Sequence, residues 1–189
     1  MKALYGVLIA TVSALGLSQT YAAGLDGSTV TFGVYYPTPT TPISQVVSTT
    51  VGSGIEFSNI DSLALPGWIV AKADVDVSQS QILIDFDWTG TGASGSFNGY
   101  VFEFSGPLNT TILNATLNPL TSLVNGAVTV TFDSNTIWLN LPLSTVNPSS
   151  QIVVDVVATA VPEPTTAILL GTGVAALLIA RRKRVLHSQ

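Results

Sequence analysis

The sequence predicts an all-β protein: an antiparallel β-sandwich, with a jelly roll as one of its forms, flanked by an N-terminal signal helix and a C-terminal transmembrane helix. Charged residues make up only 9% of the 189 residues, and the 16 glycines and 10 prolines suit strands and turns. Short segments alternate apolar and polar residues, whereas no helical periodicity appears between residues 24 and 160. An uncharged run stands near each end of the chain.

The first 22 residues have the pattern of a signal peptide. Lys2 precedes an uncharged, mostly apolar run over residues 3–17, and small residues follow that run. Thr20 and Ala22 suit the two small-residue positions that a signal peptidase requires. We therefore expect cleavage before residue 23 and an exported domain over residues 23–160.

Six segments of this domain, one of them a hairpin, are expected to form strands: residues 28–36, 68–77, 82–88, 100–104, 128–141 and 151–158. The hairpin is expected to turn at residues 133–135, and a glycine-rich loop fills residues 90–99. Ile84 and Phe86 alternate with Asp85 and Asp87, which predicts one core face and one solvent face. Without an internal repeat, a β-solenoid is the less favoured fold.

The charge of the expected domain excludes one class of partner. Residues 24–160 contain ten carboxylates and one cation, Lys72, a net charge of −9 that repels phosphates, so we expect no nucleic-acid binding. The chain has no cysteine, and its one histidine, His187, follows the C-terminal apolar run. The domain therefore lacks the usual general base and thiol nucleophile, and we expect no enzyme.

Two aspartate pairs are the candidates for chemistry: Asp74 with Asp76, and Asp85 with Asp87. Each pair would separate its Cα atoms by about 6.6 Å on a strand, within the range of glycosidase carboxylates. Catalysis also needs a cleft that raises the pKa of one carboxyl, and an open strand face provides none. We therefore expect a solvated face, with a cation site and a carboxylate-based glycosidase as less favoured alternatives.

The cation that these aspartates would suit is Ca²⁺, which takes about six to eight oxygen ligands. The glycine-rich loop or Ser78 would supply part of that set, but the dense Asp and Asn spacing of calcium loops is missing. We expect no metal and no cofactor, with Ca²⁺ as a weak alternative.

Five aromatic residues could stack on sugars: Tyr35, Tyr36, Trp68, Trp88 and Trp138. We favour the interpretation that they fill the core, because aromatic side chains in folded proteins are buried to a large extent on average. Trp138 is the exception. If Ile137 and Leu139 face the core, strand alternation turns Trp138 outward, which makes it the candidate ligand-binding residue.

The chain ends in three parts over residues 161–189. Pro162, Glu163 and Pro164 prevent a regular helix and favour an extended segment, suited either to a stiff linker or to recognition by a processing enzyme. Residues 165–180 carry no charge and would span about 24 Å as a transmembrane helix. The cationic cluster of Arg181, Arg182, Lys183 and Arg184 then keeps this end on the cytoplasmic side.

This three-part end resembles the PEP-CTERM sorting tail of Gram-negative bacteria, a segment also described as an ice-binding-protein C-terminal motif. The resemblance implies recognition by an exosortase, a membrane transpeptidase-like protease, with processing at or near Pro162, Glu163 and Pro164. It also implies retention of the precursor in the membrane by residues 181–184. Proteins with this tail are exported and are associated with exopolysaccharide and biofilm.

The function that we expect is therefore that of an exported, non-enzymatic protein with a structural or adhesive role beside exopolysaccharide. It would begin as a membrane-anchored precursor and end at the cell surface or in the extracellular matrix. The alternative is a carbohydrate-binding module, which would require exposed aromatic side chains, Trp138 among them, on one face. A carboxylate-based glycosidase would require a deep cleft that holds two carboxylates.

Overall fold

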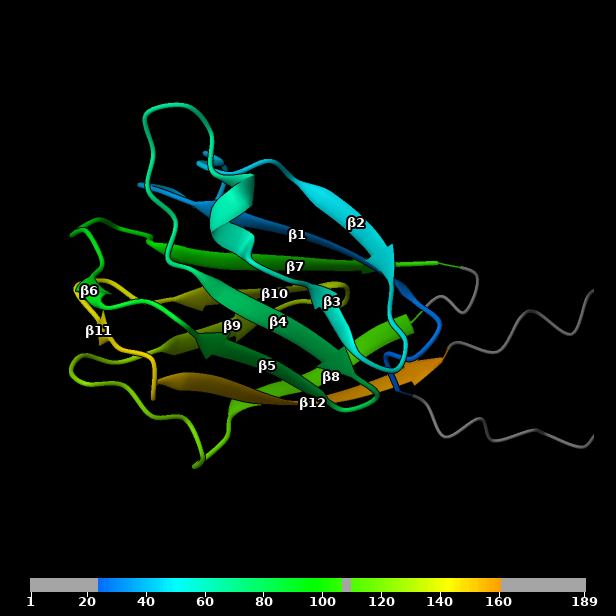
Figure 1. Ribbon diagram of the computed structural model, residues 1–189. Coiled ribbons are helices and arrows are strands. Elements are labelled where there is room, and N and C mark those ends of the chain that lie inside the picture. The colour runs from blue at the N-terminus through cyan, green and yellow to red at the C-terminus, as the bar shows by residue number, and fades with distance from the viewer. Residues whose placement is uncertain (1–23, 107–109, 161–189) are drawn as a thin grey trace, which may run out of the picture.

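The computed structural model describes residues 24–106 and 110–160, and its strands form two five-stranded antiparallel sheets (Figure 1). Sheet 1 has the order β2–β1–β7–β10–β9 and sheet 2 the order β3–β4–β5–β12–β8. The strands of sheet 1 are β1 (Thr29–Tyr35), β2 (Val47–Thr50), β7 (Gly99–Ser105), β9 (Thr129–Phe132) and β10 (Thr136–Asn140). Those of sheet 2 are β3 (Ile55–Phe57), β4 (Ala73–Ser78), β5 (Gln81–Phe86), β8 (Thr110–Leu117) and β12 (Gln151–Ala160).

Two smaller elements complete the described structure. Strands β6 (Gly90–Thr91) and β11 (Thr145–Val146) pair with each other in a separate two-stranded sheet. The helical element among the described residues is the 3-10 helix η1 (Ile60–Leu63). No helix in residues 24–106 and 110–160 is long and apolar enough to cross a membrane. The all-β prediction is thus confirmed for this part of the chain.

One hydrophobic core joins the two sheets face to face. Phe32 of β1 stacks on Phe57 of β3 with a ring-centroid distance of 5.0 Å, and Phe32 also packs against Phe102 of β7 at 5.2 Å. Ile82 and Ile84 of β5 are fully buried in the same cluster. The alternation of buried apolar and more exposed residues along strands such as β4, β5 and β10 supplies this core, because every second side chain points inward.

The strand order differs from a simple jelly roll. Four of the eight pairings in the two large sheets join strands that are consecutive in the chain: β1–β2, β3–β4, β4–β5 and β9–β10, of which the last two are tight hairpins. A jelly roll is instead built from two Greek keys. Strand β12, the last strand of the described chain, lies inside sheet 2 between β5 and β8 and pairs with both.

The six predicted strand segments all contain strands, but two were predicted too long. The strand predicted over residues 82–88 ends at Phe86, so Asp87 and Trp88 lie in the loop that follows. Strand β4 begins at Ala73, so residues 68–72, which we expected to be extended, form a loop instead. The hairpin turn falls between β9 and β10 as predicted. Strands β2, β3 and β8 and the small pair β6–β11 were not predicted.

Both described ends of the domain lie at one end of the sandwich, which we call the proximal pole (Figure 1). The Leu25 amide donates to Gln79 in the β4–β5 turn, and β12 passes that turn before it ends at Ala160. The opposite end, the distal pole, carries β6, β11 and the loops around them. Strand β12 runs along the sandwich between the two poles, and its ten residues span about 30 Å. The predicted signal peptide (residues 1–22), transmembrane helix and sorting residues lie outside the described residues.

Candidate functional site

A pocket of about 450 Å³ opens at the distal pole. Tyr36, Trp68 and Trp88 are among its lining residues, together with the polar residues Thr91, Asn98 and Ser144. No charged residue lines it among the described residues. Its volume lies within the usual range of ligand-binding pockets, and its lining suits an uncharged ligand.

Trp68 is held at the pocket by a tight turn. The segment Leu65-Pro66-Gly67-Trp68 closes with a hydrogen bond of 3.0 Å from the Trp68 amide to the Leu65 carbonyl. Proline at the second position and Gly67 with a φ of 88° at the third are the residues that a type II turn requires. The turn leaves Trp68 44% exposed, with its ring edge-on to Tyr36 at a centroid distance of 5.8 Å.

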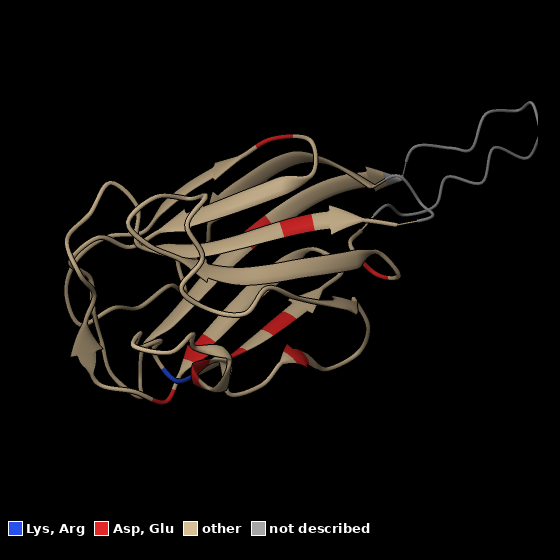
Figure 2. Cartoon of the chain, turned by 90° about the horizontal axis from the view of Figure 1, so that it is seen from above, with Lys and Arg blue, Asp and Glu red and all other residues tan. Residues whose placement is uncertain are grey.

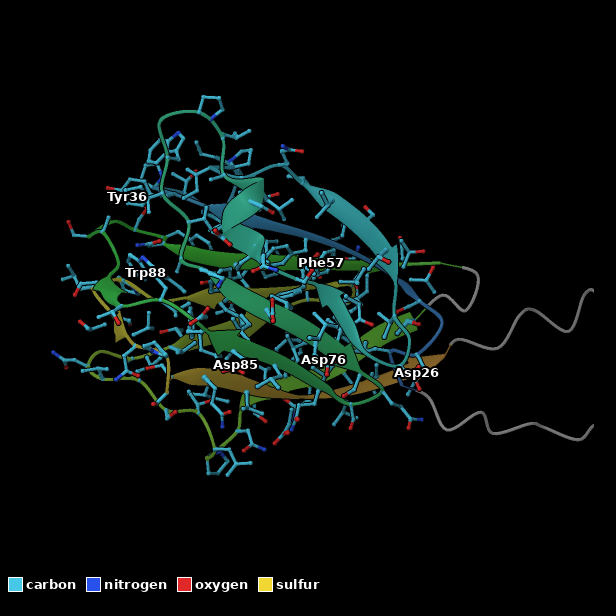
Figure 3. All side chains as sticks on the ribbon, in the orientation of Figure 1. Asp26, Tyr36, Phe57, Asp76, Asp85 and Trp88 are labelled. Carbon is cyan, nitrogen blue, oxygen red and sulfur yellow. The ribbon has the colours of Figure 1, made fainter. Side chains whose placement is uncertain are left out.

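The glycine-rich loop supports the other two rings. A Cβ atom at Gly90 would lie 2.0 Å from the Trp88 ring, and one at Gly95 would lie 2.9 Å from the Tyr36 ring. The Tyr36 hydroxyl also donates to the Ser94 carbonyl at 2.9 Å. Glycine is therefore needed at both positions for close aromatic packing, and Figure 3 shows Tyr36 and Trp88 near each other at this pole.

The polar lining of the pocket is fixed by hydrogen bonds. The Asn98 side chain donates to the Ala93 carbonyl at 2.9 Å, and the Ser144 hydroxyl donates to the Ala127 carbonyl at 3.0 Å. These bonds hold the loops that frame the opening. The pocket walls are thus held in place by contacts within the chain, which lowers the entropic cost of binding.

Trp138 lies on a second surface, the outer face of sheet 1. Its neighbours Ile137 and Leu139 are fully buried, so Trp138 points away from the core as predicted and is half-buried. Tyr35 is on the same outer face, on β1. The five candidate aromatic residues therefore divide between two surfaces, and none belongs to the fully buried set. The interpretation that they fill the core was wrong: Tyr36 and Trp88 only pack against its margin.

Asp74 and Asp76 lie on β4 and Asp85 on β5, where they alternate with buried apolar residues and so face outward from sheet 2, and Figure 3 labels Asp76 and Asp85. Asp87 follows the end of β5 and directly precedes Trp88, so the predicted pair of Asp85 and Asp87 does not share one strand. Asp74 and Asp85 are cross-strand neighbours, and Asp74 accepts a hydrogen bond of 2.7 Å from the Asn59 amide. Asp87 forms an ion pair with Lys72, whose pKa is raised by that hydrogen bond and by the charge of Asp87. Figure 2 shows the position of Lys72 in blue beside positions of Asp and Glu in red.

Asp76 has a perturbed titration. Its burial, and then the charge of Glu56, raise the pKa of Asp76 above the ordinary value. Glu56 itself accepts hydrogen bonds from the Val77 and Gly52 amides at 2.6 Å and 3.0 Å. No set of three or more metal-binding side chains comes together in residues 24–106 and 110–160.

Sequence reasoning missed the residues that assemble the pocket. The Leu65–Trp68 turn was readable from its Pro-Gly pair, a strong turn signal that would have ended the strand predicted over residues 68–77. Asn98 and Ser144 gave no comparable signal, because their role follows from loops that meet only in the folded chain.

An all-β protein with an aromatic, uncharged pocket at one pole is the class that the fold and the site define. A family model described as a PEP-CTERM protein-sorting motif matches residues 160–184. The chain therefore carries a PEP-CTERM sorting motif, which begins where β12 ends, as the resemblance indicated. The motif implies an exported protein that is processed by an exosortase. No curated protein and no solved structure matches the chain.

Proposed function

We propose that the exported domain is a non-enzymatic protein of the cell surface or extracellular matrix that binds exopolysaccharide through the distal pocket. The observation that carries this proposal is the convergence of Tyr36, Trp68 and Trp88 on one open pocket. Aromatic rings offer large apolar faces at low entropic cost, and the C–H faces of sugar rings stack on them. The hydroxyl groups of a sugar would meet Asn98, Ser144 and the loop backbone.

The negative charge of the domain favours a neutral glycan over a polyanionic one as the ligand. The pocket lining carries no charge, and residues 24–160 carry a net −9. A polyanionic polysaccharide would be repelled by this surface at low salt. A neutral polysaccharide meets no such penalty.

A non-enzymatic role is supported by where the carboxylates lie. Hydrolysis of a glycosidic bond needs two carboxylates on opposite sides of that bond. Among the described residues no carboxylate lines the distal pocket, and Asp74 and Asp87 have partners elsewhere, the Asn59 amide and Lys72. The domain is thus suited to hold a glycan rather than to cleave it. An adhesive role follows from binding alone.

The test is affinity electrophoresis of the exported protein in gels that contain exopolysaccharide from the producing bacterium, followed by calorimetric titration with neutral oligosaccharides. The variants are Trp68→Ala and Trp88→Ala, and the control is Leu113→Ala, since Leu113 is 55% exposed on β8 of sheet 2. Each tryptophan variant should weaken binding about tenfold or more, whereas the control should bind as the unchanged protein does. Equal binding by all four proteins would refute a role for the pocket.

A further inference from the structure

The outer face of sheet 1 contains a glycine that lies beneath an aromatic ring. Gly33 points outward from β1 yet is buried. A Cβ atom there would lie 2.9 Å from Cε2 of Tyr35 and 3.2 Å from Cγ2 of Val46. Both side chains therefore close over Gly33, and the Tyr35 ring leans along its own strand.

This glycine begins a row of cross-strand neighbours on the outer face of the sheet. Gly33 pairs with Val101 of β7, Val101 pairs with Trp138 of β10, and Trp138 pairs with Thr131 of β9. The row places the Tyr35 ring and the Trp138 ring about two strand spacings apart, on the order of 9.5 Å. Two aromatic side chains thus stand on one open face of the sheet.

Polar side chains form the adjacent row. Thr31 of β1, Glu103 of β7 and Thr136 of β10 are cross-strand neighbours. Glu103 shares the outer face of sheet 1 with Tyr35, and burial, and then the charge of Glu103, raise the pKa of the Tyr35 phenol. Hydroxyls and a carboxylate beside aromatic rings are the groups that bind a hydroxyl-rich chain, because the carboxylate accepts hydrogen bonds from sugar hydroxyls.

We propose that this outer face of sheet 1, centred on Trp138 and Tyr35, is a second glycan-binding surface that takes an extended, neutral polysaccharide chain. The proposal rests on the function proposed for the distal pocket, and it makes the domain bivalent. A domain with two glycan sites can cross-link separate chains, and its avidity for a polysaccharide exceeds the affinity of either site.

The shape and charge of the face indicate the kind of ligand. The rings stand in line across three neighbouring strands of an open sheet, which suits a long chain rather than a chain end. The negative charge of Glu103 and of the whole domain disfavours an anionic chain. The distal pocket, in contrast, is enclosed by loops on several sides and suits a shorter segment.

The test compares four exported proteins: the unchanged protein, the pocket variant Trp68→Ala/Trp88→Ala, the face variant Trp138→Ala, and the combination. Calorimetric titration with a neutral hexasaccharide gives the number of sites, and viscosity of a neutral polysaccharide solution reports cross-linking. We expect two sites in the unchanged protein and one in each single-surface variant, with the rise in viscosity lost in both. The combined variant should show no binding.

The outcomes separate the two proposals. If Trp138→Ala keeps both the number of sites and the viscosity, the second surface is overturned while the pocket stands. If the pocket variant alone keeps full binding and Trp138→Ala abolishes it, the pocket function fails and the second surface is supported. If no protein binds any neutral glycan, both are overturned. If Trp138→Ala turns a dimer into a monomer without loss of binding, the face is an interface between copies, and the glycan proposal is wrong.

A second pair of variants keeps the test valid if Trp138→Ala does not fold. Gly33→Ala should displace the Tyr35 ring and lower affinity for the hexasaccharide at this face about threefold or more, whereas Gly52→Ala, with nothing near its Cβ position, should change nothing. In addition, Trp68→Phe/Trp88→Phe leaves Trp138 as the one indole of the domain. Its fluorescence should shift on hexasaccharide binding, and an unchanged spectrum at saturation would overturn the proposal.

Discussion

At the scale of single residues, Asp76 shows how a carboxylate on a sheet face can lower stability. Its burial and the neighbouring Glu56 charge raise the pKa of Asp76 in the folded state. The folded state then binds the proton more tightly than the unfolded state does, so stability falls as the pH rises through this window. The folded protein is therefore less stable at neutral pH, where Asp76 is ionised, than it would be with this carboxyl protonated.

We predict that Asp76→Asn raises the Tm by a few degrees at pH 7, because the variant carries no charge beside Glu56. The gain should shrink as the pH falls toward about 4, where the unchanged carboxyl becomes protonated. Thermal unfolding of both proteins between pH 4 and pH 7 measures it. An equal gain at all pH values would mean that packing, rather than charge, accounts for the change.

The individual side chains differ in how far the sequence could place them. The outward direction of Trp138 followed from strand alternation between Ile137 and Leu139, which are both fully buried. The meeting of Tyr36, Trp68 and Trp88 could not be read, because they come from three loops that are distant in sequence. Their position depends on glycine contacts at Gly90 and Gly95 that exist only in the folded chain.

At the scale of elements, the β9–β10 hairpin is the clearest case of local sequence fixing local structure. The Asp133 carboxylate accepts hydrogen bonds from the Asn135 and Thr136 amides at 2.9 Å and 2.8 Å. The Asp133 amide donates to the Thr136 carbonyl at 2.9 Å and closes the turn. A short acidic side chain that caps its own turn sets the register of the hairpin and thereby turns Trp138 outward.

We expect Asp133→Ala to destabilise the protein by about 1 kcal/mol, because it leaves two turn amides without their side-chain acceptor. Asp133→Asn retains an acceptor oxygen and should stay close to the unchanged protein. Urea unfolding measures the difference between the two variants. Equal stability of all three proteins would show that the strand pairing alone holds the turn.

The strands that the sequence failed to reveal are mostly those at sheet edges. Strand β2 is short and half exposed, and β3 has three residues, so neither offers enough alternation to be read. Strand β8 exposes Leu113 and Leu117 to solvent, which breaks the pattern of apolar-in and polar-out residues. Edge strands are specified by tertiary pairing more than by their own periodicity. The central strands β5, β7, β10 and β12 were predictable because they fill the core on every second residue.

At the scale of the whole molecule, the described chain ends and the proposed binding pocket lie at opposite poles. The chain enters and leaves the described domain at the proximal pole, and the sorting motif begins where β12 ends. The distal pocket lies at the other end, about 30 Å away along β12. We expect removal of the predicted signal peptide and of the tail to leave the distal pocket unchanged, because the predicted cuts fall beside the described ends of the domain at the proximal pole.

The last prediction concerns the tail. Replacement of Arg181, Arg182, Lys183 and Arg184 by glutamine should impair processing, because we expect this cationic cluster to keep the tail on the cytoplasmic side until cleavage. Intact mass and terminal sequencing of protein from membrane and medium fractions measure it. The unchanged protein should begin near Ala23 and end near residues 162–164. The variant should instead accumulate with its tail uncut, or leave the membrane unprocessed.

Lys72→Gln is the matched control, because it neutralises the one cation of the domain and should leave both termini unchanged. Normal termini in the tail variant would mean that the basic cluster is dispensable for sorting. A tail that is retained in the membrane even in the unchanged protein would make it a permanent anchor, and the distal pocket would then act as an outward-facing site on a tethered protein.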